Sequence, residues 1–498
     1  MSDTTPAVVQ EARSLAASAY DTILYVGQPY ANTHPDRLAT LAILHGIEPA
    51  AVGTCRVLEI GCGDGANIVP MAATLPSAEF VGIDYAARPV ALALQMVQDL
   101  GLRNITISQL DLCDLPADAG TFDYIIVHGL YSWVPLEVRQ QVMPVIARHL
   151  APNGIAYVSY NLFPGCRVRQ TAWEMLKLHT RDCPDLPSKI VAARELISLM
   201  ADSKGALNRD EDTLRAEFRK LAHRPDGSLS HDDLNDNNNP VYFQEFVADA
   251  GCSGLAFLAE ADLFSMTAGD FLPNVREMLG RMDRLTREQY LDFLRFRPFR
   301  CSLLCHASAL PEFNLHPERV IDMHASPAHT LRHLIASGKE VRYQDDYARY
   351  VVERLLARWP ESVPVSELIA IPEAGTPQLD RAIAESAGAQ TRLLELCIAG
   401  VLDLRLRAIR PASAATLNPV VFGPARWTCN TSEIVPNLYH EGIRLGDAIA
   451  RRLVTLLDGT RTRADLMLAL DDACAGPDGA EQLENAIAGL ANRALLVA

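Results

Sequence analysis

Three glycines alternate within five positions near the start of the sequence, in the stretch VLEIGCGDGAN at residues 57–67. The string GCGDGA follows an apolar run and precedes a segment of helical character, so it fits the fingerprint G-x-G-x-x-G/A of adenosine-cofactor loops. Glycine leaves room for a ligand and tolerates backbone angles that other residues avoid. The loop alone does not separate NAD from other adenosine cofactors.

Two carboxylates close to this loop are the next candidates for chemistry. Asp84 ends the apolar stretch VGID, and a carboxylate there can accept hydrogen bonds from both ribose hydroxyls of either kind of cofactor. Glu59 lies two residues before the first glycine and discriminates between them. It repels a pyrophosphate, and it attracts a ligand that carries a sulfonium and an ammonium. Glu59 therefore favours S-adenosylmethionine over a hydride carrier.

Further residues are expected around the same cofactor. Asp111 and Leu112, in QLDL, follow a third strand and can read and cover an adenine ring. The N-terminal segment can close over the site, or it can simply begin a helix with Thr33 as its cap. The predicted cofactor-binding residues are Tyr30, Thr33, Glu59, Gly61, Gly63, Gly65, Asn67, Asp84, Tyr85, Asp111, Leu112 and His128.

The acceptor side should follow the fourth and fifth strands, in VHGLYSWVP and VSYNLFPG. Methyl transfer is an in-line displacement, so orientation supplies most of the acceleration. Aromatic rings there can hold an alkylammonium group, or they can pack beneath a loop. A histidine can serve as a structural residue or as a proton acceptor, and an asparagine can position an amine. The predicted catalytic residues are His128, Tyr131, Trp133, Tyr160 and Asn161.

The elements that must position these residues alternate between strand and helix over the first 160 residues. Such repeated units predict an α/β domain with a parallel sheet and helices on both faces. Ligands of such sheets bind at the carboxyl ends of the strands. Strands are expected at 55–61, 79–85, 104–111, 122–129 and 155–161, and helices at 37–45, 67–75, 89–101 and 138–154.

The pattern becomes mainly helical from about 185 to 335, apart from the polar stretch HDDLNDNNNP. A further mostly helical segment follows, broken by IPEAGTP, AIRPASAATLNP and DGTRTR. His231, Asp232 and Asp233 could suggest a metal, but adjacent polar residues in a turn are usually solvated or capping, and we predict no metal site. The predicted domains are 1–185, 186–335 and 336–498.

Composition narrows the class of protein. The chain has 498 residues, 49% of them hydrophobic and 21% charged, and a formal net charge of −16, which argues against a nucleic-acid partner. Its 11 cysteines contain no CxxC pair, as expected of reduced thiols in a cytosol. The first residues do not resemble a signal peptide, and no apolar run approaches the roughly 18–20 residues of a spanning helix. We expect a cytoplasmic protein without membrane insertion.

Four features in order, E-x-G-x-G-x-G, an acid at the next strand end, an acid-plus-aliphatic pair and FDYII, resemble the class I S-adenosylmethionine-dependent methyltransferases. PYANTHPDRLATLAILHGI, FDYIIVHGLYSWVP and VSYNLFPG resemble the branch with an appended methyltransferase regulatory domain. HDDLNDNNNPVYFQEFVADA, GLAFLAEAD and REQYLDFLRFRPFRCSLLCH are similar to that regulatory domain. FGPARWT and VPNLYHEGIRL are similar to the C-terminal domain of longer members.

The resemblance implies a Rossmann-like methyltransferase domain, a mostly helical regulatory domain and a mostly helical C-terminal domain, for which a winged-helix-like fold is one option. It also implies S-adenosyl-L-methionine as cofactor. The characterised members are bacterial protein-lysine methyltransferases, so N-methylation of a protein or peptide side chain, with a lysine-type amine favoured, is the leading hypothesis.

Two alternatives stay open. One is a small-molecule N- or O-methyltransferase whose appended domains form a lid and a dimer surface, and a homodimer is a possible assembly. The other is a non-catalytic cofactor-binding regulatory module, against which the intact set of Glu59, Asp84 and Asp111 argues.

Overall fold

The computed structural model describes residues 21–203, 209–309, 314–343, 345–369, 386–414, 416–470 and 479–497. The expected break IPEAGTP, at 371–377, lies outside these residues. Within them, no helix combines the length and the apolar character needed to cross a membrane.

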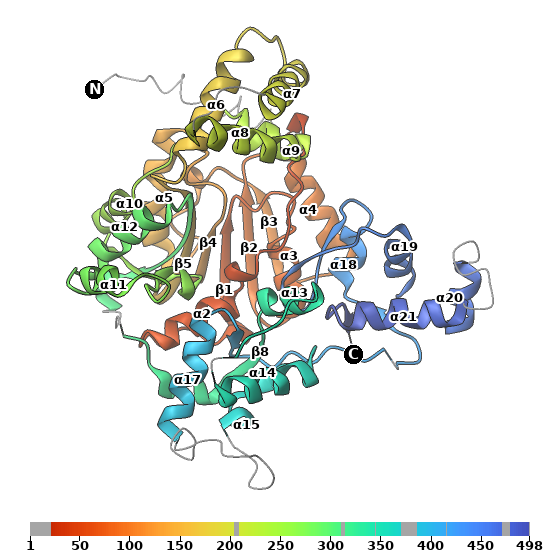
Figure 1. Cartoon of the computed structure of the whole chain (residues 1–498). Coiled ribbons are helices and arrows are strands. Elements are labelled where there is room, and N and C mark those ends of the chain that lie inside the picture. The colour runs from red at the N-terminus through yellow and green to blue at the C-terminus, as the bar shows by residue number, and fades with distance from the viewer. Residues whose placement is uncertain are drawn as a thin grey trace.

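A seven-stranded sheet with the order β3-β2-β1-β4-β5-β7-β6 forms the centre of the molecule (Figure 1). The strands β1 to β5 pair in parallel, whereas β7 and β6 are antiparallel to their neighbours. This confirms the predicted α/β fold and its five parallel strands. The bounds are β1 (Arg56–Ile60), β2 (Glu79–Asp84), β3 (Ile105–Gln109), β4 (Phe122–Val127), β5 (Leu150–Asn161), β6 (Leu255–Glu260) and β7 (Phe299–His306).

Both faces of the sheet are covered, which explains why its strands are nearly continuous apolar runs. Successive side chains of a strand point to opposite faces. Val57 of β1 therefore joins one apolar cluster and Leu58 the other, and Tyr124 and Ile125 of β4 divide in the same way. Helices α2 (Pro35–Leu44), α3 (Ile68–Thr74) and α4 (Ala87–Asp99) supply the first cluster, and α5 (Leu136–His149) and α10 (Phe243–Cys252) the second.

The mainly helical character predicted for 185–335 is confirmed, but the prediction missed β6 and β7, which extend the central sheet. The reason is a buried ionic cluster that interrupts the apolar signal of β7. The Arg300 side chain is fully buried and pairs with Glu260 at 2.7 Å, Asp292 at 2.9 Å and Glu288 at 3.1 Å. Because these strands join β5, the sheet continues across the predicted boundary at 185/186, and that boundary remains a prediction.

A separate helical layer gathers at one end of the sheet (Figure 1). It begins at residue 167, inside the first predicted domain, and has its own apolar cluster around Leu176, Ile197 and Phe218. Its members are α6 (Arg167–His179), α7 (Leu186–Asp202), α8 (Arg209–Ala222), α9 (Asp226–Ser228) and η4 (Leu229–Asp233). Helices α11 (Pro273–Gly280) and α12 (Arg284–Arg295) lie between β6 and β7 in the chain.

The described residues from 314 onward, which we call the C-terminal part, form two apolar cores. The first surrounds a three-stranded sheet of the order β10-β8-β9, formed by β10 (Leu402–Arg405), β8 (His324–Pro327) and β9 (Val363–Pro364). The helices that contribute to this core are α14 (Asp346–Arg358), α15 (Val365–Ile369) and α17 (Ser386–Ile398), and α13 (His329–Ala336) follows β8 in the chain.

The second core is built from α18 (Gly423–Thr428), α19 (Ala448–Leu456), α20 (Arg463–Ala469), α21 (Gly479–Ala491) and the strand pairs β11 (Val420–Val421) with β14 (Leu496–Val497) and β12 (Ile434–Pro436) with β13 (Gly442–Arg444). This second core packs against the methyltransferase-like part, where α18 lies beside α3 and α4 (Figure 1). The indole Nε1 of Trp427 donates to Asp99 Oδ2 at 2.9 Å.

Candidate functional site

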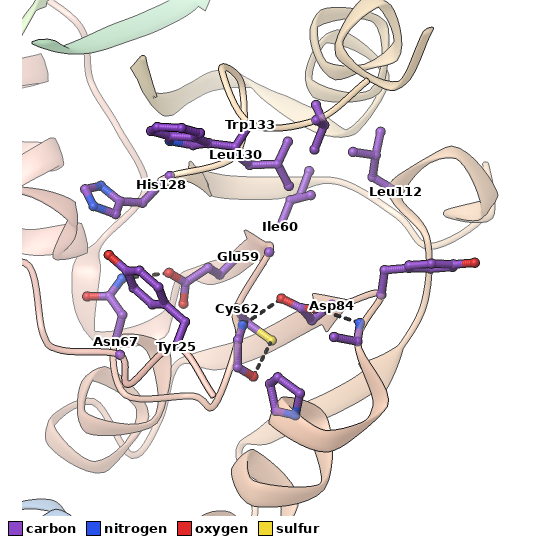
Figure 2. A pocket seen from close by; sticks show the side chains of 18 of the residues that line it. Tyr25, Glu59, Ile60, Cys62, Asn67, Asp84, Leu112, His128, Leu130 and Trp133 are labelled. Carbon is purple, nitrogen blue, oxygen red and sulfur yellow. Dashed lines mark hydrogen bonds between the residues drawn. The ribbon is translucent and has the colours of Figure 1, made fainter. Parts of the chain in front are cut away.

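A cavity of about 440 Å³ lies at the carboxyl ends of β1 and β4. The chain moves outward from β1 to β3 on one side and from β4 to β5 on the other, so this is the topological switch point at which open α/β sheets bind ligands. Figure 2 shows this cavity from close by. The predicted residues that line it are Tyr30, Glu59, Gly61, Gly63, Asn67, Asp84, Tyr85, Asp111, Leu112, His128, Trp133 and Asn161.

The glycine loop adopts backbone angles that only glycine takes easily. Gly61 has φ +79° and Gly63 has φ +54°, and a Cβ on Gly63 would meet open space. Gly65 does not line the cavity. A Cβ there would come within 2.8 Å of Val69 Cγ2 and 3.0 Å of Ala93 Cβ, so this glycine lets α3 pack closely on α4. The first two glycines serve the cavity and the third serves helix packing.

Asp84 anchors one side of the cavity. Its Oδ2 accepts from the backbone N–H of Gly63 at 2.9 Å, and its Oδ1 accepts from that of Ala86 at 2.9 Å. Each carboxylate oxygen has further acceptor capacity for ligand hydroxyls. Burial raises the pKa of this carboxyl. Asp84 and Leu112 lie on the same side of the cavity, opposite Glu59 and Asn67 (Figure 2).

Glu59, on the other side of the cavity, indicates which kind of ligand binds there. It is 3% exposed, and its Oε1 accepts from Asn67 Nδ2 at 2.7 Å. Its Oε2 is buried without a hydrogen-bond partner among the residues that the structure describes. Burial raises the pKa of Glu59 to about 8. Because a buried polar atom without a partner is costly, this oxygen fits a ligand that brings a cationic donor.

All four hydrogen-bonding positions of the Asn67 side-chain amide have a partner in the protein. Its Oδ1 accepts from the Tyr30 backbone N–H and from His440 Nε2, each at 2.9 Å. Its Nδ2 donates to Glu59 Oε1 and to Thr33 Oγ1, the latter at 3.0 Å. An amide with two donors and two acceptor sites satisfied has one orientation, so the amide group always presents its N–H to Glu59.

Thr33 does not line the cavity, and it supports the site through its hydrogen bond with Asn67. The prediction that Thr33 caps the following helix is wrong. His34 is the N-cap, and its Nδ1 accepts from the Asp36 backbone N–H at 3.1 Å. The Thr33 hydroxyl instead donates to the Tyr30 carbonyl at 2.8 Å.

The acceptor candidate His128 lies against Tyr30, with ring centroids 3.8 Å apart. Its Nδ1 is hydrogen-bonded to the Tyr157 hydroxyl at 3.0 Å, so Nε2 is the ring nitrogen left to meet a ligand. Burial lowers the pKa of His128 to about 4, which keeps the ring neutral at neutral pH. Trp133 and Asn161 also line the cavity, and Asn161 Nδ2 donates to Asn238 Oδ1 at 3.3 Å.

Tyr131 and Tyr160 are not brought to the cavity. Tyr160 stacks on Phe246 with centroids 4.0 Å apart, and its hydroxyl pairs with Ser302 Oγ at 3.1 Å. The Tyr131 hydroxyl donates to Asp249 Oδ2 at 2.7 Å. Tyr160 and Asn161 are neighbours on β5, and side chains alternate along a strand, so only one of them can face the cavity.

Several lining residues escaped the sequence reasoning. Asp64 lies within the quoted loop, and its Oδ2 accepts from the Gly27 backbone N–H at 3.1 Å, which ties the N-terminal segment to the cavity. Its position within the glycine loop GCGDGA is the sequence signal that could have identified Asp64 as a lining residue. Others lie outside every stretch quoted above, namely Tyr25, Gln28, Cys166 and Arg169. Further lining residues lie in stretches quoted above, but without a predicted role at the site: Leu130, Asp232, Asn235, Pro298 and Phe299.

The stretch His231–Asp233 is engaged by other groups of the protein. His231 Nε2 is hydrogen-bonded to the Ile23 carbonyl at 2.5 Å. Asp232 pairs with Arg224 at 2.9 Å, and Asp233 pairs with Arg169 at 3.0 Å. In the described part of the chain, no group of three or more histidine, cysteine and acidic side chains could hold a metal ion.

Comparisons with known proteins agree with this architecture. Residues 57–154 match the family model of a methyltransferase domain, 225–306 that of a predicted methyltransferase regulatory domain, and 418–478 that of the PKMT C-terminal winged helix domain. The protein RP789 of Rickettsia prowazekii is 38% identical over 289 residues, which cover 58% of this chain and 52% of that protein. RP028 of the same organism is 31% identical over 233 residues, covering 47% of this chain and 93% of that one. The chain thus spans about half the length of the first of these relatives.

Among solved structures, PKMT2 from Rickettsia typhi matches with a TM-score of 0.81 at 23% identity, over 95% of this chain and 100% of that one. A second structure of PKMT2, in complex with AdoHcy, matches equally well at 24% identity. At these identities the likeness establishes a shared fold.

The glycine loop at the switch point, together with the match over 57–154, defines a class I methyltransferase. The chain belongs to the family of S-adenosylmethionine-dependent methyltransferases in which this domain is followed by the predicted regulatory domain and a PKMT winged helix domain. The expected resemblance and the winged-helix option for the C-terminal part are confirmed.

Proposed function

We propose that this protein transfers a methyl group from S-adenosylmethionine to a nitrogen atom of a protein or peptide side chain, with a lysine-type amine as acceptor. The observation that carries the proposal is that one cavity holds both the unpaired, buried Oε2 of Glu59 and a set of aromatic rings. The carboxylate suits the cationic end of the donor, and the rings suit an alkylammonium acceptor.

The donor would be held by residues on both sides of the cavity. Asp84 would accept from the ribose hydroxyls, Asp111 and Leu112 would border the adenine, and Glu59 would pair with the ammonium group. When bound, S-adenosylmethionine supplies an electrophilic methyl group. The negative charge of Asp84, joined by that of Glu59 once it ionises to pair with a cation, disfavours a diphosphate in the same place, which supports this donor over a nicotinamide nucleotide.

The acceptor would enter past Tyr30, His128, Trp133 and Phe299, whose rings all line the cavity. A lysine-type ammonium must lose a proton before its nitrogen can attack. The neutral His128 presents Nε2 to that proton, and because its pKa is about 4 the ring relays the proton to water and does not hold it. Asp232 and Asn235 of the regulatory segment border the same cavity, so that segment contributes to the acceptor entrance.

A protein acceptor is further supported by the PKMT winged helix match and by the PKMT2 fold shared over nearly the whole chain. The absence of a nucleic-acid partner, the homodimer and the domain boundaries stay predictions.

The test uses the purified full-length chain with S-adenosylmethionine labelled with tritium in its methyl group, added to a bacterial lysate. We expect label in protein bands, and acid hydrolysis of those bands should release labelled methyl-lysine. Asp84→Ala should remove the label, whereas Asp114→Asn, an exposed acid outside the cavity, should not. Label found only in the small-molecule fraction would favour the metabolite alternative, and no label anywhere would favour the non-catalytic module.

A further inference from the structure

A second cavity, of about 410 Å³, lies between the methyltransferase domain and the C-terminal part. It shares no lining residue with the cavity that holds Glu59. Figure 1 shows the region where α18 approaches α3 and α4. The walls include the end of α3, the segment after α4, the last residue of β10 with residues 407–410 beyond it, and the start of α18. Cavities of this size accommodate small molecules.

Three arginines line this cavity: Arg405, Arg407 and Arg410. Arg405 is only 9% exposed, and its guanidinium lies over the Tyr439 ring, 4.6 Å from the centroid. Its Nε is buried without a hydrogen-bond partner, and no described residue accepts a hydrogen bond from the guanidinium or forms a salt bridge with it. A buried cation in this state is costly, so this guanidinium fits a ligand that brings a hydrogen-bond acceptor.

The acidic side chain that lines this cavity does not compensate these cations fully. Asp36 accepts from the backbone N–H of Leu406 at 2.7 Å and from that of Arg407 at 3.2 Å, so both of its oxygens are already engaged. Burial lowers the pKa of His34, which also lines the cavity, so its ring is neutral. Three arginines against one aspartate leave a formal charge of +2 around the cavity.

Apart from Thr74, the remaining walls are apolar or aromatic. Phe422, Pro424, Leu438 and Val497 contribute them, together with the ring of Tyr439. A ligand that fits this lining therefore combines a compact anionic group with an apolar body. A phosphate monoester carries about −1.5 to −2 charges near pH 7 and presents oxygens to which guanidinium forks bind in a bidentate manner.

We propose that this second cavity is a binding site for a small phosphate monoester, with its phosphate held by Arg405, Arg407 and Arg410 and its apolar body against Phe422 and Leu438. A carboxylate would leave one of the two positive charges uncompensated. Inorganic phosphate would compensate the charge but would leave the apolar walls unfilled. The site is independent of the proposed methyl transfer, because it shares no wall with the cofactor cavity.

The experiment is calorimetric titration of the full-length protein with phenyl phosphate, inorganic phosphate and benzoate, with S-adenosylhomocysteine already saturating. We expect one phenyl phosphate per chain, and weaker binding of inorganic phosphate and of benzoate. Arg405→Gln should weaken the binding of phenyl phosphate by about tenfold or more, because it removes charge-assisted hydrogen bonds. The double variant Arg407→Gln/Arg410→Gln changes only exposed side chains and should weaken binding without disturbing the fold.

The matched control is Arg444→Gln, which removes the same charge from an exposed arginine of the C-terminal part that pairs with Glu433 at 3.1 Å and lies outside the cavity. Its affinity for phenyl phosphate should equal that of the wild type. The proposal is overturned by a titration with no saturable phase, by an equal loss in the control, or by full affinity in both cavity variants. Binding of inorganic phosphate as tight as that of phenyl phosphate would overturn the assignment of an apolar body.

Discussion

His440 Nε2 lies 2.9 Å from Asn67 Oδ1, across 373 positions of sequence. An amide oxygen can only accept, so the imidazole donates through Nε2. Burial lowers the pKa of His440 to about 3, which keeps the ring neutral. The contact joins the C-terminal part to the amide that hydrogen-bonds Glu59, so a residue from the far end of the chain supports the cofactor cavity through Asn67.

Because of this contact, we expect His440→Ala to lower the affinity for S-adenosylhomocysteine by about tenfold. This is the effect of losing one hydrogen bond worth roughly 1–1.5 kcal/mol. His440→Gln should recover most of the affinity, because its side-chain amide can donate from a similar position. Calorimetry measures both. Tyr439→Phe is the matched control, because it removes a hydrogen bond of 2.7 Å to the Pro360 carbonyl outside the cofactor cavity. Equal affinities in Ala and Gln variants would show that His440 does not act through Asn67.

Asp84 should contribute more to cofactor affinity than any other lining residue. Its replacement by alanine removes a carboxylate that can meet two ribose hydroxyls, each hydrogen bond to a charged group being worth about 1.5–3 kcal/mol. We expect affinity for S-adenosylhomocysteine to fall by about a hundredfold or more. The exposed Asp114→Asn variant should bind like the wild type. An unchanged affinity in Asp84→Ala would refute the ribose assignment.

Glu59 should make cofactor binding depend on pH. Burial raises its pKa to about 8, so the side chain is mostly protonated at neutral pH. Pairing with an ammonium group requires the ionised form, so binding releases a proton and affinity rises with pH. Between about pH 6 and about pH 7 the ionised fraction, and with it the affinity for S-adenosylhomocysteine, should rise by about tenfold.

The check on this dependence is Glu59→Gln, which cannot titrate. Calorimetry in buffers of different ionisation enthalpy should detect the released proton in the wild type and none in the variant. A variant with the same pH dependence as the wild type would assign the proton to another group.

His128 should affect turnover more than binding of the donor. We expect His128→Ala to lower kcat by about a hundredfold, the usual scale of a proton-transfer role, with little change in the affinity for S-adenosylhomocysteine. Kinetics with the labelled donor and calorimetry separate the two quantities. Parallel losses in kcat and affinity would reduce His128 to a packing partner of Tyr30.

Tyr160 should matter for stability and not for chemistry. Tyr160→Phe removes a buried hydroxyl whose partner, Ser302, also hydrogen-bonds to Glu260 at 2.6 Å. We expect the free energy of unfolding to fall by about 1 kcal/mol, with kcat unchanged. Denaturant titration and the methylation assay test the two halves. A large loss of kcat without a loss of stability would return Tyr160 to the acceptor site.

The parts of the fold that sequence predicts well are those with local signals. A few consecutive residues are enough to recognise the apolar runs of β1 and β4 and the glycines at 61 and 63. This is because backbone angles and strand periodicity are local properties. β7 escaped prediction because Arg300 and Ser302 occupy buried positions, and the partners that make this tolerable come from β6 and α12. The same limit applies to His440, whose role depends on a fold that brings two distant segments together.

The position of β7 along the outer edge of β5 has a consequence for any attempt to shorten the protein. A fragment that ends near residue 185 would leave Ala156–Asn161 without its backbone pairing partner and would bare a long, apolar strand margin. Exposed edge strands of this kind pair with strands of other chains and lead to aggregation. The smallest autonomous catalytic unit should therefore extend at least to His306, so the regulatory segment is a structural part of the methyltransferase and not a detachable accessory.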